Sequence, residues 1–284
     1  MRKAIVYLLV FTFTTIIYGQ NKPAYKLYNS KGKKVSYKKM IKKMNKTDVV
    51  MFGEHHNNPI VHWLQYETTV ELGKTRKLML GAEMFEADNQ KELNDYLVGE
   101  IDQKAFDTVA RLWKNYSTDY KPLVDYAKTN KLKFIATNVP RRFASQVFRG
   151  GFESLEKLSD EEKTWLAPLP IAYDATLPGY VKMKSMMGGH GGDNLPKAQA
   201  VKDATMGHFM LENMEGDRLF IHYNGSYHSD HYEGINWYLK KGNPNLNIIT
   251  VSVVEQDDIH KFNEEEKLKA DYIIVVPTTM TKTY

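Results

Sequence analysis

Asp48-Val49-Val50-Met51-Phe52-Gly53-Glu54-His55-His56 is a short apolar run that ends in a glycine and three titratable residues. An apolar run of this length, rich in β-branched side chains, is typical of a strand buried on both faces of a sheet. Similar runs follow along the chain at 78–80, 134–137, 219–223, 248–254 and 272–276. The sequence therefore predicts a central, mostly parallel sheet flanked by helices.

Segments with a helical period separate these apolar runs, for example at 60–72 and 195–214. Strands that alternate with helices indicate an α/β fold with right-handed crossovers. We expect residues 20–140 and 196–284 to form this α/β main domain.

The stretch 141–195 interrupts the alternation, because it contains no strand signal. It carries three prolines, a cluster of methionines and a histidine, His190, between two pairs of glycines. A structureless loop of this length is unusual inside a compact domain, so we predict a small helical insertion. We expect it to act as a lid over the functional site; surface decoration is the alternative.

The first 19 residues have the layout of a secretory signal peptide. Arg2 and Lys3 precede an uncharged apolar run at 4–18, and Gly19 offers a small residue for cleavage. We expect an exported protein of the periplasm or cell envelope, with an uncleaved N-terminal anchor as the alternative. The chain has no cysteine, which excludes a lipid anchor on cysteine, a disulfide and a thiolate nucleophile.

The net charge of +5 is partly local, since the stretch 31–46 holds eight lysines. Runs of this kind are most often the solvated face of a surface segment. Tyr37 is the only aromatic residue among these lysines, and export also argues against a nucleic-acid partner. We therefore predict a solvated face and no nucleic-acid binding.

Polar residues follow four of the predicted strands, where the apolar runs end. Ligands of open α/β sheets bind in the crevice outside the carboxyl ends of the strands. We therefore expect these segments to converge on one pocket, formed by Glu54, His56, Glu83, Asn138, Arg141 and His228. The pattern G-x-x-H occurs twice, as 53–56 and 225–228, and a glycine there would allow a sharp turn off the strand.

Two histidines and two glutamates in one pocket leave several roles open. They could bind a divalent metal ion, or they could form a general acid/base set that activates a water molecule. In a structural role, Glu54 and Glu83 would accept hydrogen bonds and hold the strand ends together.

The same blocks resemble the ChaN-like, haem-binding iron-regulated proteins, in the right order from about residue 48 to 239. They are Phe52-Gly53-Glu54-His55-His56, Gly81-Ala82-Glu83-Met84-Phe85, Asn138-Val139-Pro140-Arg141, Gln199-Ala200-Val201-Lys202-Asp203-Ala204-Thr205-Met206 and Asn224-Gly225-Ser226-Tyr227-His228. The resemblance implies an exported α/β domain with a helical lid that binds haem between paired subunits in iron uptake. It also implies an outer-membrane haem receptor as a partner and a homodimer when haem is bound.

The chain departs from the family pattern at two points. Well-known members carry an acylated cysteine, which this chain lacks, and Asn57 stands where an aspartate is common. The family also looks distantly related to the erythromycin esterases and to the TraB/TIKI-like metalloproteases.

Haem iron accepts an axial histidine, tyrosine or methionine, and we select Tyr180 and His190 of the insertion as candidate ligands. The sequence thus favours an exported haem-binding protein that acts in haem and iron acquisition. The alternative is an exported hydrolase, metal-dependent or acid/base, with Glu54, His56, Glu83 and His228 in catalytic roles.

Overall fold

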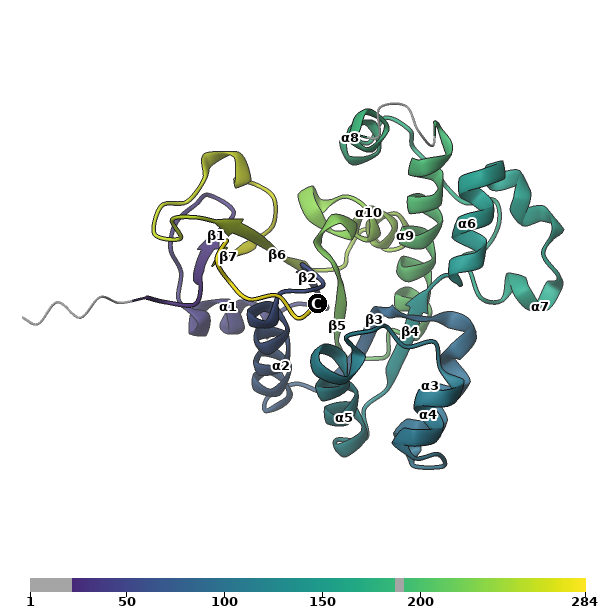
Figure 1. Ribbon diagram of the computed structural model, residues 1–284, viewed down its shortest axis with the longest axis horizontal. Coiled ribbons are helices and arrows are strands. Elements are labelled where there is room, and N and C mark those ends of the chain that lie inside the picture. The colour runs from purple at the N-terminus through teal and green to yellow at the C-terminus, as the bar shows by residue number, and fades with distance from the viewer. Residues whose placement is uncertain (1–21, 187–191) are drawn as a thin grey trace, which may run out of the picture.

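The computed structural model describes residues 22–186 and 192–284 (Figure 1). The predicted leader at 1–19 and the candidate ligand His190 lie outside these residues. The strands are β1 (Lys26–Asn29), β2 (Val49–Glu54), β3 (Leu78–Glu86), β4 (Phe134–Asn138), β5 (Leu219–Gly225), β6 (Ile248–Gln256) and β7 (Tyr272–Pro277). The α-helices are α1 (Tyr37–Met44), α2 (Pro59–Gly73), α3 (Gln90–Val98), α4 (Gln103–Val109), α5 (Lys121–Thr129), α6 (Arg141–Gly150), α7 (Asp160–Lys163), α8 (Pro178–Met186), α9 (Asn194–Asn213) and α10 (Ile235–Gly242).

The strands form one sheet in the order β1-β7-β6-β2-β5-β3-β4. Every pair is parallel except β1 with β7. The predicted mostly parallel sheet is therefore confirmed. The antiparallel edge strand β1 was not predicted, because its four residues are only half apolar and only half buried, so no apolar run marks it.

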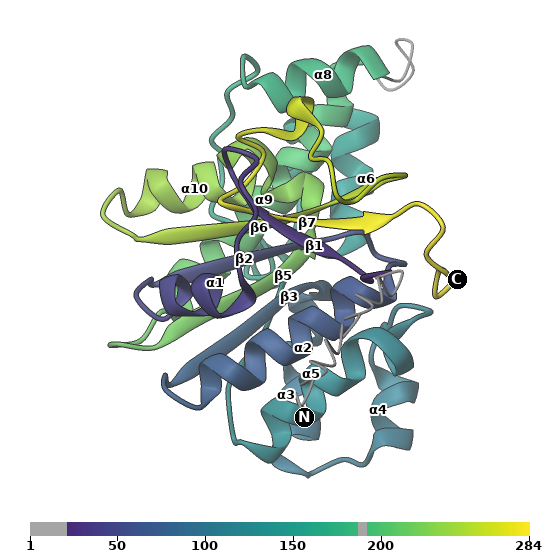
Figure 2. The same ribbon diagram turned by 90° about the vertical axis from the view of Figure 1, so that its left-hand side faces the viewer.

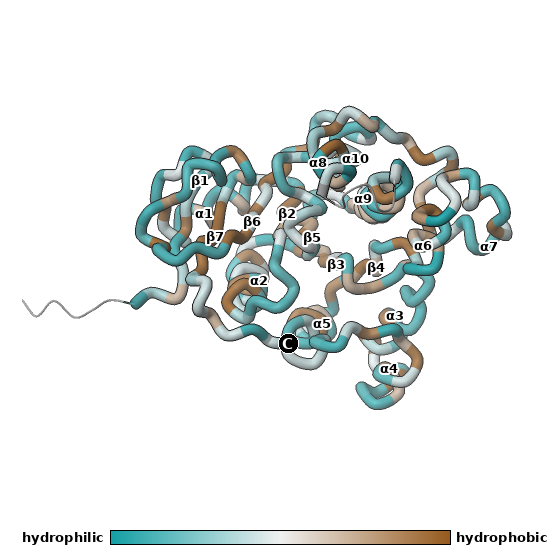
Figure 3. The backbone as a smooth tube through the Cα atoms, turned by 45° about the horizontal axis from the view of Figure 1, so that its top comes forward, coloured by the Kyte–Doolittle hydropathy of each residue, from teal (hydrophilic) through white to brown (hydrophobic). Residues whose placement is uncertain are grey.

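Helices cover both faces of the sheet (Figure 2). On one face, α1, α2, α3 and α5 pack on apolar side chains such as Phe52, Leu80 and Tyr223. On the other, α9 and α10 pack on Val49, Met51 and their neighbours. Colouring by hydropathy shows the same layering, with apolar residues along β6 and β7 and hydrophilic outer loops (Figure 3). Among the described residues, no helix combines the length and apolarity needed to cross a membrane.

The described part of 141–195 contains helices and turns but no strand. Within it, a 3₁₀ segment (Phe152–Lys157) is followed by the short α7, rather than by one continuous helix. Ser159 starts α7 with a capping box, in which its hydroxyl and Glu162 exchange hydrogen bonds with the backbone. Buried residues of α6 pack against α9 in a small core of their own. The division at 141 and 195 stays a prediction.

The adjacent strands β2 and β5 set the place of the site. After β2 the chain continues through α2 to β3, on one side of the pair. After β5 it continues through α10, on the opposite face, to β6 on the other side. Where neighbouring strands leave in opposite directions, their carboxyl ends frame a crevice. Glu54 and Gly225, the last residues of β2 and β5, are paired at this point.

Gly53 fits this junction because a side chain has no room there. A Cβ atom at position 53 would lie 2.7 Å from the carbonyl oxygen of Val251 and 3.0 Å from the Cα of Ser226. Both neighbours are backbone atoms of adjacent segments, so relief would require the strands to separate.

We expect Gly53→Ala to destabilise the fold by about 1–3 kcal/mol through overpacking. Urea unfolding measures this, as a lowered midpoint at an unchanged slope. Gly150→Ala is the control, because its added Cβ meets only the Ser154 Cβ at 3.4 Å. Equal stability of the two variants would contradict the close packing at β2.

Candidate functional site

The carboxyl ends of the strands surround a cavity of about 530 Å³. Glu54 is the last residue of β2, Glu83 lies within β3, and His228 follows β5 in a short 3₁₀ turn. All three line the cavity together with His56. The structure thus brings the two histidines of the G-x-x-H segments together with Glu54 and Glu83.

A second cavity, of about 730 Å³, adjoins the first, since His56, Glu83 and Lys202 line both. Asn138 and Arg141 line this larger cavity. All six residues predicted for the pocket therefore lie around two connected cavities. The other lining residues of the larger one include Arg111, Leu112, Trp113, Lys114, Val139 and Tyr284.

Glu54 is a buried carboxylate that three side chains stabilise. Gln65 Nε2 donates to its Oε2 at 2.6 Å, Tyr120 donates to its Oε1 at 2.7 Å, and His56 Nδ1 lies 2.8 Å from Oε1. Burial raises the pKa of Glu54, but the hydrogen bond from His56 and the charges of nearby histidines outweigh it, so the pKa is lowered. Glu54 is therefore ionised at neutral pH.

His56 connects this buried carboxylate to the cavity. Its side chain is 34% exposed, whereas that of Glu54 is fully covered. Burial lowers the pKa of His56, but its hydrogen bond to Glu54 and the charge of Glu83 raise it above the ordinary value. With Nδ1 fixed on Glu54, the other ring nitrogen is the one free to meet a ligand.

His228 lies between two buried carboxylates. Its Nε2 is 3.1 Å from Glu83 Oε1, and its Nδ1 donates to Asp203 Oδ1 at 2.5 Å. Burial lowers the pKa of His228, but the charges of Glu83 and Asp203 outweigh this and raise it to about 10. His228 is thus a buried imidazolium, and the pKa of Glu83 is correspondingly lowered.

The glycines of the G-x-x-H segments are needed for close packing. The sharp turn that we expected from them is not present. Neither glycine has a positive φ; Gly225 has φ −56°. A Cβ atom on Gly225 would lie 2.9 Å from two atoms of the His56 ring. Its N–H also donates to Glu83 Oε2 at 2.7 Å. Gly225 therefore allows His56 and Glu83 to lie against the end of β5.

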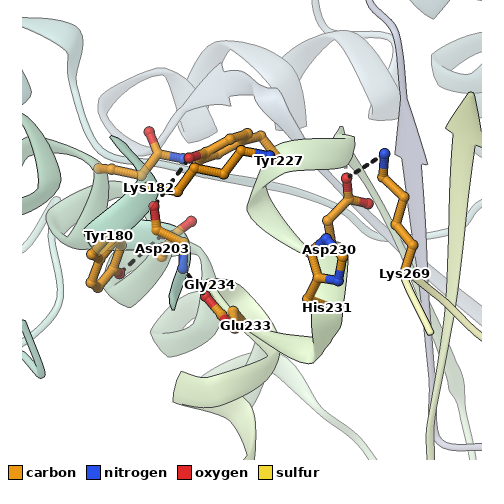
Figure 4. A pocket seen from close by; sticks show the side chains of 11 residues that line it. Tyr180, Lys182, Asp203, Tyr227, Asp230, His231, Glu233, Gly234 and Lys269 are labelled. Carbon is orange, nitrogen blue, oxygen red and sulfur yellow. Dashed lines mark hydrogen bonds and ion pairs between the residues drawn. The ribbon is translucent and has the colours of Figure 1, made fainter. Parts of the chain in front are cut away.

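Tyr180 of α8 lies behind this site, in a third and smaller cavity of about 140 Å³ (Figure 4). Only 4% of the residue is exposed, and its hydroxyl donates to Asp203 Oδ2 at 3.3 Å. Burial and the charge of Asp203 raise its pKa. The small cavity shares Gln199 and Tyr227 with the 530 Å³ cavity. Tyr180 does not line the larger of these two cavities, but it contacts Asp203, which contacts His228 there.

Sequence reasoning missed Asp203 as a member of the site. It is buried in α9 with Ala200, Val201 and Ala204. A lone carboxylate among apolar helix residues is the signal that could have found it, because a buried charge requires a partner. Trp113 was also missed, since it lies in an irregular stretch after α4, which ends at Val109.

No group of three or more histidine or acidic side chains within 22–186 and 192–284 is arranged to hold a metal ion. The ring nitrogens of His228 and Nδ1 of His56 already face carboxylates. The divalent metal considered from the sequence therefore has no support in the described site.

The buried imidazolium makes the stability of the fold depend on pH. The pKa of His228 rises from the ordinary 6.5 to about 10 on folding, so its contribution to stability is complete below about pH 6.5 and is lost as the pH rises toward 10. We expect the free energy of unfolding to fall by up to about 1.4 kcal/mol per pH unit in this window.

Urea unfolding at several pH values between these limits measures the slope. His228→Gln removes the titrating group and should flatten the slope, whereas the exposed His260→Gln should keep it. A free energy of unfolding that stays constant with pH in the unmodified protein would contradict a charged His228, whether or not the His228 variant folds.

Comparison with solved structures shows likeness along most of the chain. ChaN of Campylobacter jejuni, described as showing cofacial haem binding, is 18% identical, with a TM-score of 0.67 over 89% of this chain and 96% of that chain. A Bacillus cereus protein is 12% identical, with a TM-score of 0.50 over 89% of this chain and 95% of that chain. An erythromycin esterase in its open conformation is 8% identical, with a TM-score of 0.46 over 81% of this chain and 77% of that chain.

At such identities these structures show the fold alone, and no curated protein matches the sequence. A family model is more specific. The model described as haem-binding uptake, Tiki superfamily, ChaN matches residues 40–239, and this span includes β2 to β5 and all six predicted pocket residues. Because the match covers well over half of the 284 residues, the protein belongs to the ChaN family of haem-binding uptake proteins.

Proposed function

We propose that this protein is exported and binds haem in the strand-end cavities, as part of haem and iron acquisition at the cell envelope. Membership of a haem-binding uptake family supports haem as the ligand. The observation that carries the proposal is the 730 Å³ cavity, whose size lies in the range of small-molecule sites.

The residues around this cavity suit the chemistry of haem, a flat apolar macrocycle with two carboxylates. Leu112, Trp113 and Val139 provide an apolar wall. Arg141 and Lys202, with Lys114, provide positive charges for the carboxylates. The ring of His56 lies edge-on to Trp113, with centroids 4.9 Å apart, so the apolar wall and the polar strand ends are continuous.

For the iron ligand we propose Tyr180 and His190. When bound, haem supplies an iron atom that accepts such axial ligands. A tyrosine binds iron most strongly after losing its proton, and Asp203 lies next to the Tyr180 hydroxyl. Burial and the charge of Glu83 raise the pKa of Asp203, despite the opposing charge of His228. Because burial and the charge of Asp203 also raise the pKa of Tyr180, this contact by itself does not favour loss of the Tyr180 proton.

The wider role follows from the same family and from the N-terminal sequence. We propose that the leader at 1–19 is cleaved near Gly19 and that the protein acts in the periplasm or envelope without a lipid anchor. We also propose a homodimer in the haem-loaded state and an outer-membrane haem receptor as a partner. The cofacial haem binding described for the Campylobacter protein supports a paired arrangement.

A hydrolase remains the second candidate, because one observation favours it. His56 Nδ1 lies 2.8 Å from the buried Glu54, and the ring is open to the cavity. A carboxylate that orients a histidine in this way is a common general-base arrangement. In that role Glu54, His56, Glu83 and His228 would act on a bound substrate.

Titration with hemin tests the proposal, and we expect a shifted Soret band that saturates. Tyr180→Phe and His190→Ala should each weaken binding by at least about tenfold and change the visible spectrum, because an iron ligand is lost. Tyr173→Phe is the control, since Tyr173 stacks on Tyr180 with centroids 5.4 Å apart. No Soret shift, together with ester hydrolysis that His56→Ala abolishes, would favour the hydrolase instead.

The positive charges of the cavity generate a separate prediction. We expect Arg141→Gln combined with Lys202→Gln to raise the Kd for hemin by about tenfold, because two partners of its carboxylates are lost. Arg149→Gln with Lys157→Gln removes the same charge from exposed sites outside the cavity and should leave the Kd unchanged. An equal loss of hemin affinity in both double variants would contradict a role for these two side chains, because net charge alone would then explain the effect.

A further inference from the structure

The stretch 31–46 forms a strongly basic surface, which we name the lysine face. Its eight lysines are all exposed, and the stretch contains no aspartate or glutamate. Within the part of the chain that the structure describes, no carboxylate forms an ion pair with any of them. The lysine face consists of Lys31, Lys33, Lys34, Lys38, Lys39, Lys42, Lys43 and Lys46.

The helix α1 carries four of these eight lysines and orders them in one direction. Met40, Ile41 and Met44 are buried against the sheet. Lys38, Lys39, Lys42 and Lys43 repeat with the helical period on the opposite side. The helix begins at Ser36, whose hydroxyl accepts from the N–H of Lys39. The positive charge is thus fixed on the outer side of an ordered helix.

An exposed tryptophan lies on the helix next to α1, beside a half-buried tyrosine that precedes β1. Trp63 of α2 is 49% exposed, and its ring stands edge-on to Tyr25 with centroids 6.2 Å apart. The two helices are joined by the Tyr37 hydroxyl, 3.2 Å from Thr68 Oγ1. Figure 2 shows α1 and α2 side by side on the same face of the sheet. Tryptophan and tyrosine favour the interface between water and lipid.

We propose that the lysine face docks on the surface of an anionic lipid bilayer. Each lysine near such a surface adds electrostatic attraction, so four or more can hold the domain there reversibly. All eight cations are lysines and none is arginine. Lysine is a compact point charge that suits mobile headgroups, whereas arginine is the usual choice for fixed, two-pronged recognition of phosphate or carboxylate. This composition favours lipid over a nucleic acid or a folded acidic protein.

Docking in this way would leave the strand-end cavities accessible. No residue of α1 lines either cavity; the lining comes from β2 to β5, α6, α9 and loops such as the one after α4. The inference therefore goes beyond haem binding and stands or fails separately from it. It also gives a chain without cysteine a means of staying at a membrane surface.

Co-sedimentation of the mature protein, from Gln20 onward, with lipid vesicles tests the proposal. We expect binding to phosphatidylcholine vesicles that contain about 30% phosphatidylglycerol, little binding to phosphatidylcholine alone, and marked weakening at about 0.3 M salt. Lys38→Gln, Lys39→Gln, Lys42→Gln and Lys43→Gln together should weaken binding by at least about tenfold.

The control replaces four exposed lysines elsewhere, Lys104, Lys131, Lys157 and Lys261, by glutamine and should bind as the unmodified protein does. Equal binding to neutral vesicles, or an equal loss in both four-lysine variants, would overturn the proposal. Binding to a short DNA duplex without binding to anionic vesicles would also overturn it, by assigning the surface to nucleic acid. Both variants should keep the hemin affinity of the unmodified protein.

Discussion

A buried imidazolium between two buried carboxylates is the constraint on which the site depends. Burying a charge is costly unless it is paired and hydrogen-bonded. His228 meets that condition through Glu83 of β3 and Asp203 of α9, while Glu83 also accepts the N–H of Gly225 at the end of β5. Strand β3 is therefore held to α9 and the end of β5, which come more than 100 residues later, and removing one member leaves the others buried without compensation.

The same cluster links the sheet to the helical segment above it. Asp203 accepts from Tyr180 as well as from His228, so α8 is connected to the strand ends through one carboxylate. On the other side of Gly225, the buried Glu54 is paired with the half-buried His56, whose ring opens to the cavity. The site therefore has fixed, charged groups at the bottom and an apolar wall with Trp113 at the side. Such a site can orient an amphipathic ligand.

The sequence was sufficient to predict most of the sheet, because each of its six strands other than β1 is an apolar run long enough to recognise. It was also sufficient to gather Glu54, Glu83 and His228, since carboxyl ends of parallel strands meet at one edge. It could not reveal β1, whose residues lack an apolar run, or the pairing of Asp203 with His228, which depends on how α9 packs over the sheet. The close-packing role of Gly225 depends likewise on three-dimensional neighbours.

We propose that haem binds in the cavity at the strand ends, and the position of its iron would test this. Crystals of the hemin-loaded protein, measured at the iron absorption edge, would give that position as an anomalous peak. We expect a peak between α8 and the cavity lined by His56, Trp113 and Arg141. A peak on an outer surface, away from these residues, would contradict it.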